Sequence, residues 1–333
     1  TTGASNTGLG FKALFANTTG TSNTAVGTNS LDANTTADHN TAVGQSALGT
    51  NTTGAQNTAV GSGALITNTT GTGNTASGVN ALYFNTSGDS NTAVGGGALQ
   101  ANTTADSNTA FGTFALHRST TGYGNTAVGS LSGDSITTGL NNTTVGRASL
   151  TTCTTGGSNV AMGVSALEGL TTGSNNVAIG PNTGGAITTG YENTCIGKSA
   201  GDAITTGNNN IIIGQSVDPD SASQAHAIVI GVGFTGSGND FSFGKASNVV
   251  TNDFNADANW SRSSDERLKK NVTNQSLGLD FINNLRTVKY NWKASNELDS
   301  TDAQLAHLYK EDAADNEMDT DVVMHNFIAQ EVK

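Results

Sequence analysis

The chain has 333 residues, of which 12% are charged and 5% aromatic, and 43 are glycine. This composition is far from that of an average enzyme domain, and the net charge of −12 argues against nucleic-acid binding. The charge is spread thinly, because residues 1–263 carry −7 (6 basic and 13 acidic residues) and residues 264–333 carry −5 (8 basic and 13 acidic). No apolar run is long enough to span a membrane and no signal peptide opens the chain, which we expect to be a piece of a longer protein.

An asparagine recurs at a fixed 17-residue spacing from Asn6 to Asn210, thirteen times, without an insertion or deletion. We number positions 1–17 from this asparagine; the clearest copy, residues 91–107, reads N-T-A-V-G-G-G-A-L-Q-A-N-T-T-A-D-S. Position 5 is glycine in every copy, from Gly10 to Gly214. A fixed period of this length indicates a stack of identical units rather than a disordered linker. We therefore predict a mainly β fold in which residues 1–214 form a β-solenoid shaft.

Positions 3 and 4 are both apolar, usually alanine and then valine or isoleucine, as in Ala25–Val26 and Ala59–Val60. Neighbouring residues of a strand face opposite sides, so both faces of the predicted sheet are apolar. We expect the large residues at position 4 to fill the interior of each coil. We expect the alanines at position 3 to meet another chain, because small side chains let backbones approach closely.

Positions 9 and 12 vary together. Position 9 is usually leucine, but it is glycine at Gly133, Gly184 and Gly201. In those copies position 12, asparagine in the first six copies, is isoleucine. One large side chain is lost as another appears, so we predict that the two positions share one space.

The polar positions have structural roles in this prediction. Glycine at position 5 tolerates a positive φ at a corner where a Cβ would clash. The asparagines at position 1 are expected to hydrogen-bond in a ladder from coil to coil, and the Thr-Thr-Gly stretch is expected to form a β-rich edge closed by a turn.

A single stack would leave one apolar face in water, so we expect a homotrimer around a common axis. The N-T-A-V-G core of residues 6–214 resembles the head repeats of trimeric autotransporter adhesins and the shaft repeats of bacteriophage tail fibres. Residues 215–263 lose the 17-residue spacing and are predicted to form a β-rich tip, with strands at 226–231, 241–244 and 249–254 around a turn at 236–240. Phe254 and Trp260 are expected in the tip's core rather than on a glycan-binding surface.

Residues 263–272 read S-S-D-E-R-L-K-K-N-V. This motif resembles the start of the self-cleaving intramolecular chaperone domain that ends phage endosialidases and many tail fibres and tailspikes. A helix followed by a strand is expected at 279–293, as in that family, and F-I-A-Q-E-V at 327–332 is similar to its second signature block. The resemblance covers about residues 255–333 and implies a chaperone domain at 264–333, α+β and incomplete here. The residues that match the motifs are Ser264, Asp265, Arg267, Leu268, Lys269, Gln330 and Glu331.

The same resemblance implies a Ser–Lys pair that cuts the bond between Ser263 and Ser264. Ser264 is a weak nucleophile unless a base takes its proton, and a buried lysine such as Lys269 can act as that base. The five-residue spacing is awkward within a helix, so Ser264 is expected at or before a helix N-cap.

No cofactor or metal site is predicted. The histidines (His39, His117, His226, His307 and His325) lack metal-ligand spacing. Cys153 and Cys195 lie three repeats apart, about 14 Å along the axis, so we expect two buried thiols and no disulfide.

The leading hypothesis is a structural and adhesive phage tail fibre on the virion, whose partners are its own copies, a glycan receptor on the host surface and other tail proteins. One alternative is a bacterial trimeric adhesin, which would end in a membrane anchor. Another is a glycan-degrading tailspike, which would need paired carboxylates; acids such as Glu168, Glu192 and Asp202 are expected at unrelated repeat positions. A third is ice binding through threonine ladders.

Overall fold

The computed structural model describes residues 2–253, 288–290 and 324–326. The chain divides into two units, Thr1–Ser261 and Arg262–Lys333. The strands are β1 (Thr7–Leu9), β2 (Thr24–Val26), β3 (Thr41–Val43), β4 (Thr58–Val60), β5 (Thr75–Ser77), β6 (Thr92–Val94), β7 (Thr109–Phe111), β8 (Thr126–Val128), β9 (Thr143–Val145), β10 (Val160–Met162), β11 (Val177–Ile179), β12 (Thr194–Ile196), β13 (Ile211–Gln215), β14 (Asp218–Pro219), β15 (Ile228–Val232), β16 (Thr235–Gly236), β17 (Asp240–Lys245), β18 (Asn248–Asp253), β19 (Val288–Tyr290) and β20 (Met324–Asn326).

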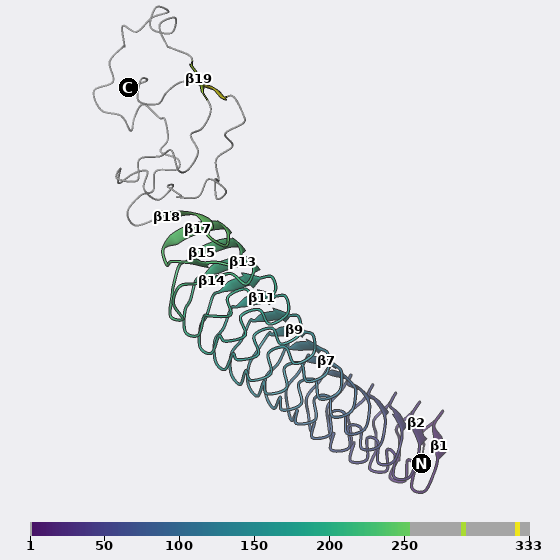
Figure 1. Ribbon diagram of the computed structural model, residues 1–333. Helices are drawn as coiled ribbons and strands as arrows, with labels where there is room; N and C mark the ends of the chain where they lie inside the picture. Colours follow the sequence, from purple (N-terminus) through teal and green to yellow (C-terminus); the bar gives the residue numbers. More distant parts are fainter. Residues whose placement is uncertain (1, 254–287, 291–323, 327–333) are drawn as a thin grey trace, which may run out of the picture. The chain divides into compact units, whose positions relative to one another are not determined.

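The first unit is a β-solenoid, as predicted (Figure 1). Strands β1 to β13 pair in chain order, each parallel to the next and in register with the equivalent residue of the following repeat, as in Thr7↔Thr24 and Val177↔Thr194. Each repeat is therefore one coil, and successive coils are about 4.8 Å apart. Equivalent positions of the repeat stack into columns along the shaft.

Glycine at position 5 ends each short strand. Its φ lies between 125° and 145° in the copies from Gly10 to Gly214, a region that other residues rarely adopt. A Cβ on Gly112 would lie 2.5 Å from the carbonyl oxygen of Gly129 in the next coil. The predicted corner is confirmed, and its reason is the close stacking of backbones.

The prediction of which face points inward was wrong. The alanines at position 3, including Ala25 and Ala59, are fully buried inside the coil, whereas position 4 points outward and Val60 is 41% exposed. The reason is the narrow interior. At Gly8, the one glycine at position 3, an added Cβ would already contact Ala13 and Leu14 across the coil at 3.8 Å. The space opposite the leucine is small, so alanine predominates at position 3, with Thr144 the larger buried exception in the coil of Leu150, and the larger side chain of each pair faces out.

The interior is filled by the leucines at position 9 and by the residues at position 12, rather than by position 4, and positions 9 and 12 share one space as predicted. A Cβ on Gly184 would lie 3.0 Å from Cδ1 of Ile187, so the isoleucine occupies the space of the missing leucine. Cys195 takes a similar place beside Gly201, where a Cβ would lie 2.5 Å from its sulfur. The two positions share one space, and a residue at position 3 can also fill it.

Two columns of buried asparagines run beside this apolar core. At position 1, the predicted ladder is present: Asn6 Oδ1 accepts a hydrogen bond from the backbone N–H of Asn23 (2.8 Å). At position 12, Asn34 Nδ2 donates to Asn17 Oδ1 (2.9 Å). Both columns also hold position 15, since the side chains of Asn23 and Asn34 each donate to the carbonyl of Ala37 (2.8 and 3.1 Å).

The Thr-Thr-Gly stretch differs from its prediction, because it forms no strand in these coils. It is nevertheless hydrogen-bonded from coil to coil. The backbone N–H and the hydroxyl of Thr18 both donate to the carbonyl of Thr35 (2.9 Å each). The stretch therefore contributes a second line of contacts along the shaft.

The 17-residue spacing continues one coil further than predicted. Strand β15 pairs in parallel with β13, and Ile211 lies opposite Ile228, again at the full repeat spacing. The next coil is shorter, because β17 follows with Phe241 opposite Ile228. Strand β18 then turns back antiparallel to β17 and is the last strand of the sheet. The strands predicted at 226–231, 241–244 and 249–254 correspond to β15, β17 and β18.

In the second unit, β19 and β20 form an antiparallel pair, with Val288 opposite Asn326 and Tyr290 opposite Met324. Strand β19 lies within the region where the sequence predicts a strand after a helix. The predicted helix, together with Phe254 and Trp260, lies outside the described residues.

Candidate functional site: two exposed surfaces of the shaft

The residues predicted for self-cleavage all lie outside the described part of the chain. They are Ser263, Ser264, Asp265, Arg267, Leu268, Lys269, Gln330 and Glu331. The geometry of the Ser–Lys pair therefore stays a prediction. Within the described residues, two surfaces of the solenoid carry side chains that the fold itself does not require.

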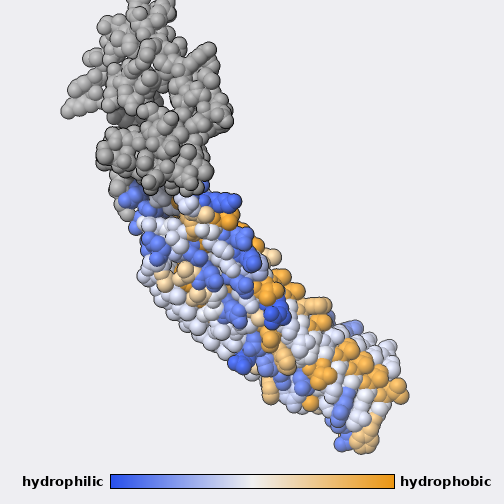
Figure 2. All heavy atoms as spheres, viewed as in Figure 1, coloured by the Kyte–Doolittle hydropathy of each residue, from blue (hydrophilic) through white to orange (hydrophobic). Residues whose placement is uncertain are grey.

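The first surface is the outer strand face, which we define as the side chains at positions 2 and 4 of the coils. Threonine predominates at position 2, and position 4 is a column of large apolar residues interrupted once, by Ser77. Several are well exposed, from 37% at Ile230 to 67% at Leu9. Figure 2 shows the apolar band that follows the strand side of the shaft. From Thr7 to Ile230 neither position carries a charged residue, so the face is uncharged along its whole length.

Large exposed apolar surfaces are rare on monomeric soluble proteins, and they mark sites of contact with another molecule. Here it follows from the fold. The narrow interior takes the alanines, and the alternation of the strand then directs valine, isoleucine and phenylalanine outward. The face runs along a stack of parallel strands, so a partner of matching length would cover many coils at once.

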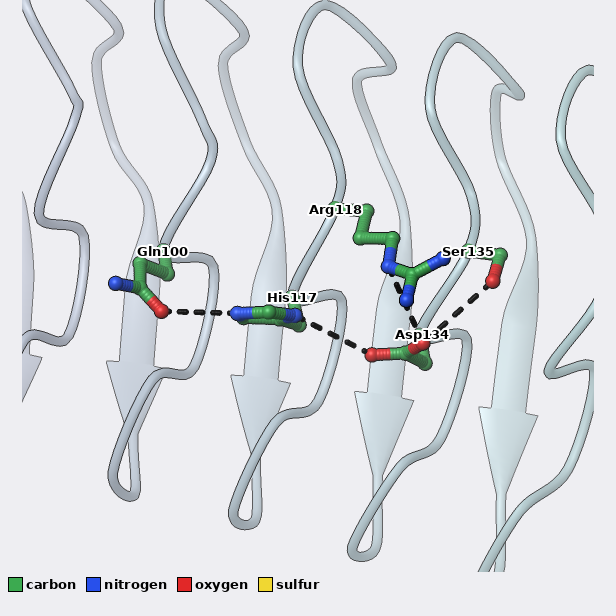
Figure 3. A network of polar contacts seen from close by, with 5 residues as sticks. All are labelled: Gln100, His117, Arg118, Asp134 and Ser135. Atoms are coloured by element: carbon green, nitrogen blue, oxygen red, sulfur yellow. Dashed lines mark hydrogen bonds and ion pairs between the residues drawn. The ribbon is translucent and has the colours of Figure 1, made fainter.

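The second surface is the polar column, a line of side chains at positions 10 and 11 of three consecutive coils. His117 lies in its middle, with Nε2 2.8 Å from Oε1 of Gln100 in the preceding coil. Its Nδ1 lies 3.5 Å from Oδ1 of Asp134 in the following coil. Figure 3 shows these three side chains in a row, with Arg118 and Ser135 both directed at Asp134. The polar column consists of Gln100, His117, Arg118, Asp134 and Ser135.

Asp134 contacts the other three side chains at one end of the polar column, His117, Arg118 and Ser135. Its Oδ2 lies 3.7 Å from Nε of Arg118 and accepts a hydrogen bond from the hydroxyl of Ser135 at 3.5 Å. The Arg118 side chain is 64% exposed, whereas that of Asp134 is 17% exposed. The Asp134 carboxylate is thus half-buried among its neighbours, and the Arg118 guanidinium remains accessible to a ligand.

Aromatic rings flank the polar column. Phe114, 42% exposed, packs edge-on against His117 with ring centroids 4.9 Å apart. Gly97 makes room for it, since a Cβ there would lie 2.7 Å from the phenylalanine ring. One coil before Gln100, Tyr83 and Phe84 form a second edge-on pair at 4.7 Å.

Sequence reasoning missed the polar column, because positions 10 and 11 differ from copy to copy and give no repeating signal. A signal does exist: Gln100, His117 and Asp134 occupy the same position of three successive repeats, so the stacking brings them together.

Other candidate sites in the described residues are weaker. A shallow depression of about 390 Å³ is lined by Thr104, Ala105, Asp106, Ser107, Thr121 and Tyr123. Glu168 and Asp202 were expected at unrelated positions but share position 10, two coils apart and about 10 Å along the axis. Both carboxylates are exposed, away from that depression. No group of residues in the described part of the chain could hold a metal ion.

Burial is the main cause of the raised pKa values among the described titratable groups. Burial raises the pKa of Cys153 to about 11 and that of Cys195 to about 12, so both thiols stay protonated near neutral pH, and both are free as predicted. Burial also raises the pKa of Asp218 and, with repulsion from Asp253 and Asp220, that of Asp240. The backbone hydrogen bond from Thr21 lowers the pKa of Asp38.

Comparison with known protein families adds the decisive observation for the second unit. Residues 264–333 match the family described as chaperone of endosialidase. We call these residues the chaperone segment. The match begins at Ser264, the residue predicted to become a new N-terminus, and it includes strands β19 and β20. A search of curated proteins found no match to this chain. No helix among the described residues has the length and hydropathy needed to cross a membrane.

Proposed function

We propose that this chain is a bacteriophage tail fibre: a homotrimeric β-solenoid shaft, exposed on the virion, that the chaperone segment assembles. The observation that carries the proposal is the order of the two parts, a β-solenoid followed by residues that match the chaperone of endosialidase family. The solenoid supplies a long, regular body. The chaperone segment supplies a means of bringing chains together in the correct alignment.

The outer strand face is the proposed contact between chains. Burying a large apolar side chain contributes roughly 1.5–3 kcal/mol, and position 4 carries such a side chain in every coil except that of Ser77. Three copies around one axis hide this face from water without leaving a free edge. The contact is therefore made by the valine side of the strands and not by the alanine side.

Alignment is the problem that a chaperone solves for such a chain. Because every coil resembles the next, two chains displaced by one whole repeat would still bring threonine and valine columns together. Such displaced pairings lie close in energy to the correct one and would trap the chains during assembly. The short coil between β15 and β17 and the antiparallel β18 break the repeat, so alignment is defined at this end of the shaft.

Self-cleavage at Ser263–Ser264 completes the proposed assembly. Lys269 takes the proton of the Ser264 hydroxyl, and Oγ attacks the carbonyl carbon of Ser263. The peptide C–N bond breaks, the amine of Ser264 takes up that proton, and Ser263 is left as an ester on Oγ. Water then hydrolyses the ester and frees the chaperone segment. Removal of the aligning segment makes dissociated chains unable to reassemble, so the fibre becomes kinetically stable.

The assembly is tested by the mass of the full chain in solution, measured by light scattering. We expect three copies per particle. A particle of one copy at micromolar concentration would overturn the proposed trimer.

The cleavage is tested with Ser264→Ala and its neighbour Ser263→Ala. The wild type and Ser263→Ala are expected to give two fragments on a denaturing gel, with a new N-terminus at residue 264. Ser264→Ala is expected to stay whole, because it lacks the nucleophile. Cleavage of Ser264→Ala, or a wild type that stays whole, would contradict the Ser–Lys mechanism.

Adhesion to the host is the remaining part of the proposal. A fibre that meets a cell surface needs accessible side chains that are not used in folding or in contacts between chains. The shaft has such side chains outside the outer strand face, at positions 10 and 11 of the coils. Other tail proteins would be the fibre's partners on the virion.

A further inference from the structure

We propose that the polar column is a binding site for a neutral polysaccharide that lies across the coils, an inference that rests on the proposed role as a receptor-binding fibre. The supporting observation is a set of fixed hydrogen-bonding side chains flanked by exposed aromatic rings. Few ligands need both. A sugar ring offers hydroxyl groups at its rim and apolar C–H groups on its faces.

The hydrogen-bonding groups are held ready for a ligand. His117 lies between Gln100 and Asp134, with Nε2 2.8 Å from Oε1 of Gln100, and Asp134 lies beside Arg118 and Ser135. Side chains that already have one conformation lose little entropy when a ligand binds. The amide nitrogen of Gln100 points away from His117 (Figure 3), so it can donate to a ligand oxygen.

The aromatic rings supply the apolar part of the site. Phe114 lies beside His117, and the Tyr83–Phe84 pair lies at the Gln100 end of the polar column. Phe84 is 49% exposed and Phe114 42% exposed, although neither contributes to the interior of the coil. Such rings pack against the C–H face of a sugar in water.

The spacing of the polar column suits a chain rather than a single sugar. Gln100, His117 and Asp134 repeat once per coil, about 4.8 Å apart. This interval is close to the length of one sugar unit in an extended polysaccharide. A linear polymer running along the shaft would therefore present successive hydroxyl groups to successive coils.

The charges favour a neutral ligand. Arg118, the guanidinium of the polar column, is paired with Asp134, so the pair offers no net positive charge. Residues 1–263 carry a net charge of −7, which disfavours the approach of a polyanion. The depression beside Tyr123 is the competing site, but its carboxylate at Asp106 already accepts a hydrogen bond from the backbone of Asp89 (2.7 Å).

The test uses the full chain on an array of glycans. The array carries neutral oligomers of hexoses, deoxyhexoses and N-acetylhexosamines, together with sialylated and uronic-acid oligomers. We expect binding to at least one neutral oligomer, with affinity that increases with oligomer length. Binding to none of the neutral oligomers, or to the acidic oligomers alone, would overturn the proposal.

Variants locate the site on the shaft. Phe114→Ala and Gln100→Ala are each expected to reduce the affinity at least tenfold, whereas Tyr123→Ala and Tyr191→Ala, at exposed tyrosines of position 16, are expected to leave it unchanged. Circular dichroism of each variant checks that the shaft is folded. Unchanged binding by a folded Phe114→Ala, or an equal loss in Tyr123→Ala, would contradict the assignment. The solution mass of the same samples reports the trimer separately, so failure of sugar binding and failure of assembly are distinguishable.

Discussion

At the scale of single residues, most coils keep a large side chain in the interior by placing it at one of three positions, and only the coil of Leu167 and Leu170 has large side chains at both position 9 and position 12. Leu99 supplies it at position 9, Ile187 at position 12 and Ile212 at position 3, and all three are fully buried. A close-packed interior tolerates such exchanges only when the volume removed at one point returns at another.

The exchange between positions 9 and 12 predicts a strong coupling between Gly184 and Ile187. Ile187→Ala should destabilise the shaft by about 2–4 kcal/mol through the cavity it leaves. Gly184→Leu alone should cost about 1–3 kcal/mol, because the new side chain meets Ile187. The double variant should cost less than the sum by at least about 1 kcal/mol, since the leucine fills the cavity.

The measurement for this coupling is urea unfolding followed by circular dichroism. The backbone does not forbid the leucine, because Leu167 has a φ of 51° at the same position and Gly184 has 59°. The control pairs Gly184→Leu with Ile136→Ala, three coils away, where the two effects should add. Additivity in the adjacent pair as well would show that the positions do not share a space.

The sequence was sufficient for the exchange but not for the direction of the strand. The gain of Ile187 where Gly184 appears is visible in the repeat itself. Alternation along the strand shows only that Ala25 and Val26 face opposite ways, and both are apolar. The deciding quantity is the width of the coil, which depends on the backbone opposite, at positions 8 and 9.

At the scale of the strand and its corner, the glycine at position 5 sets how closely the coils stack. A Cβ on Gly112 would meet backbone atoms of the next coil at 2.5–3.0 Å, and backbone atoms held by hydrogen bonds cannot move aside easily. Gly96, in the preceding coil at position 6, has no such neighbour, since its Cβ would lie 4.0 Å from the nearest atom. The two glycines form a matched pair.

We expect Gly112→Ala to destabilise the shaft by at least about 2 kcal/mol, from the strained φ of 142° together with the clash. Gly96→Ala should change the free energy of unfolding by no more than about 0.5 kcal/mol. Thermal unfolding of both variants measures the difference. Equal stability of the two would mean that the corner does not limit the stacking.

Fold elements with a repeating signal were predictable, and those without one were not. The corner recurs in every copy, so its conformation follows from thirteen glycines at one position. The coil that contains β15 was missed because its first residue is Ala227 instead of asparagine. The hydrogen bond that identifies this coil uses only the backbone N–H of Ala227, which donates to Asn210 Oδ1 (2.9 Å) and leaves no trace in the residue type.

At the scale of the whole molecule, the outer strand face makes the proposed trimer separable from the fold of one chain. Val94 and Val128 belong to this face and point away from the interior. Replacing both by aspartate places charges in the contact between chains, where an unpaired buried charge costs several kcal/mol. The coil of each chain should still form.

We therefore expect the variant Val94→Asp/Val128→Asp to have the mass of one copy by light scattering and a β-type circular dichroism spectrum like that of the wild type. Thr121→Asp, at an exposed position away from the strands, serves as the charge control and should keep the mass of three copies. A double variant that stays trimeric would show that the chains meet through another surface.

The two asparagine columns differ in how each can stop. At position 1, the side-chain Oδ1 of each asparagine accepts a hydrogen bond from the main-chain N–H of the next coil, a group that every residue but proline has. The last asparagine, Asn210, therefore still has a donor in Ala227. At position 12, the side-chain Oδ1 of each asparagine accepts a hydrogen bond from the amide side chain of the next asparagine, as Asn85 does from Asn102. The last asparagine, Asn102, has no such neighbour, and its buried Oδ1 is without a partner among the described residues. One unsatisfied Oδ1 arises at the end of each unbroken series of asparagines, whatever its length, and it costs about 1–3 kcal/mol of stability. Six consecutive asparagines thus incur the cost of one, whereas the same six scattered singly would incur it six times. A shaft of this type can be lengthened at no such cost by duplicating a coil within the series of asparagines. Alternating coils that have asparagine at position 12 with coils that have an apolar residue there is disfavoured, because each break leaves another unsatisfied Oδ1.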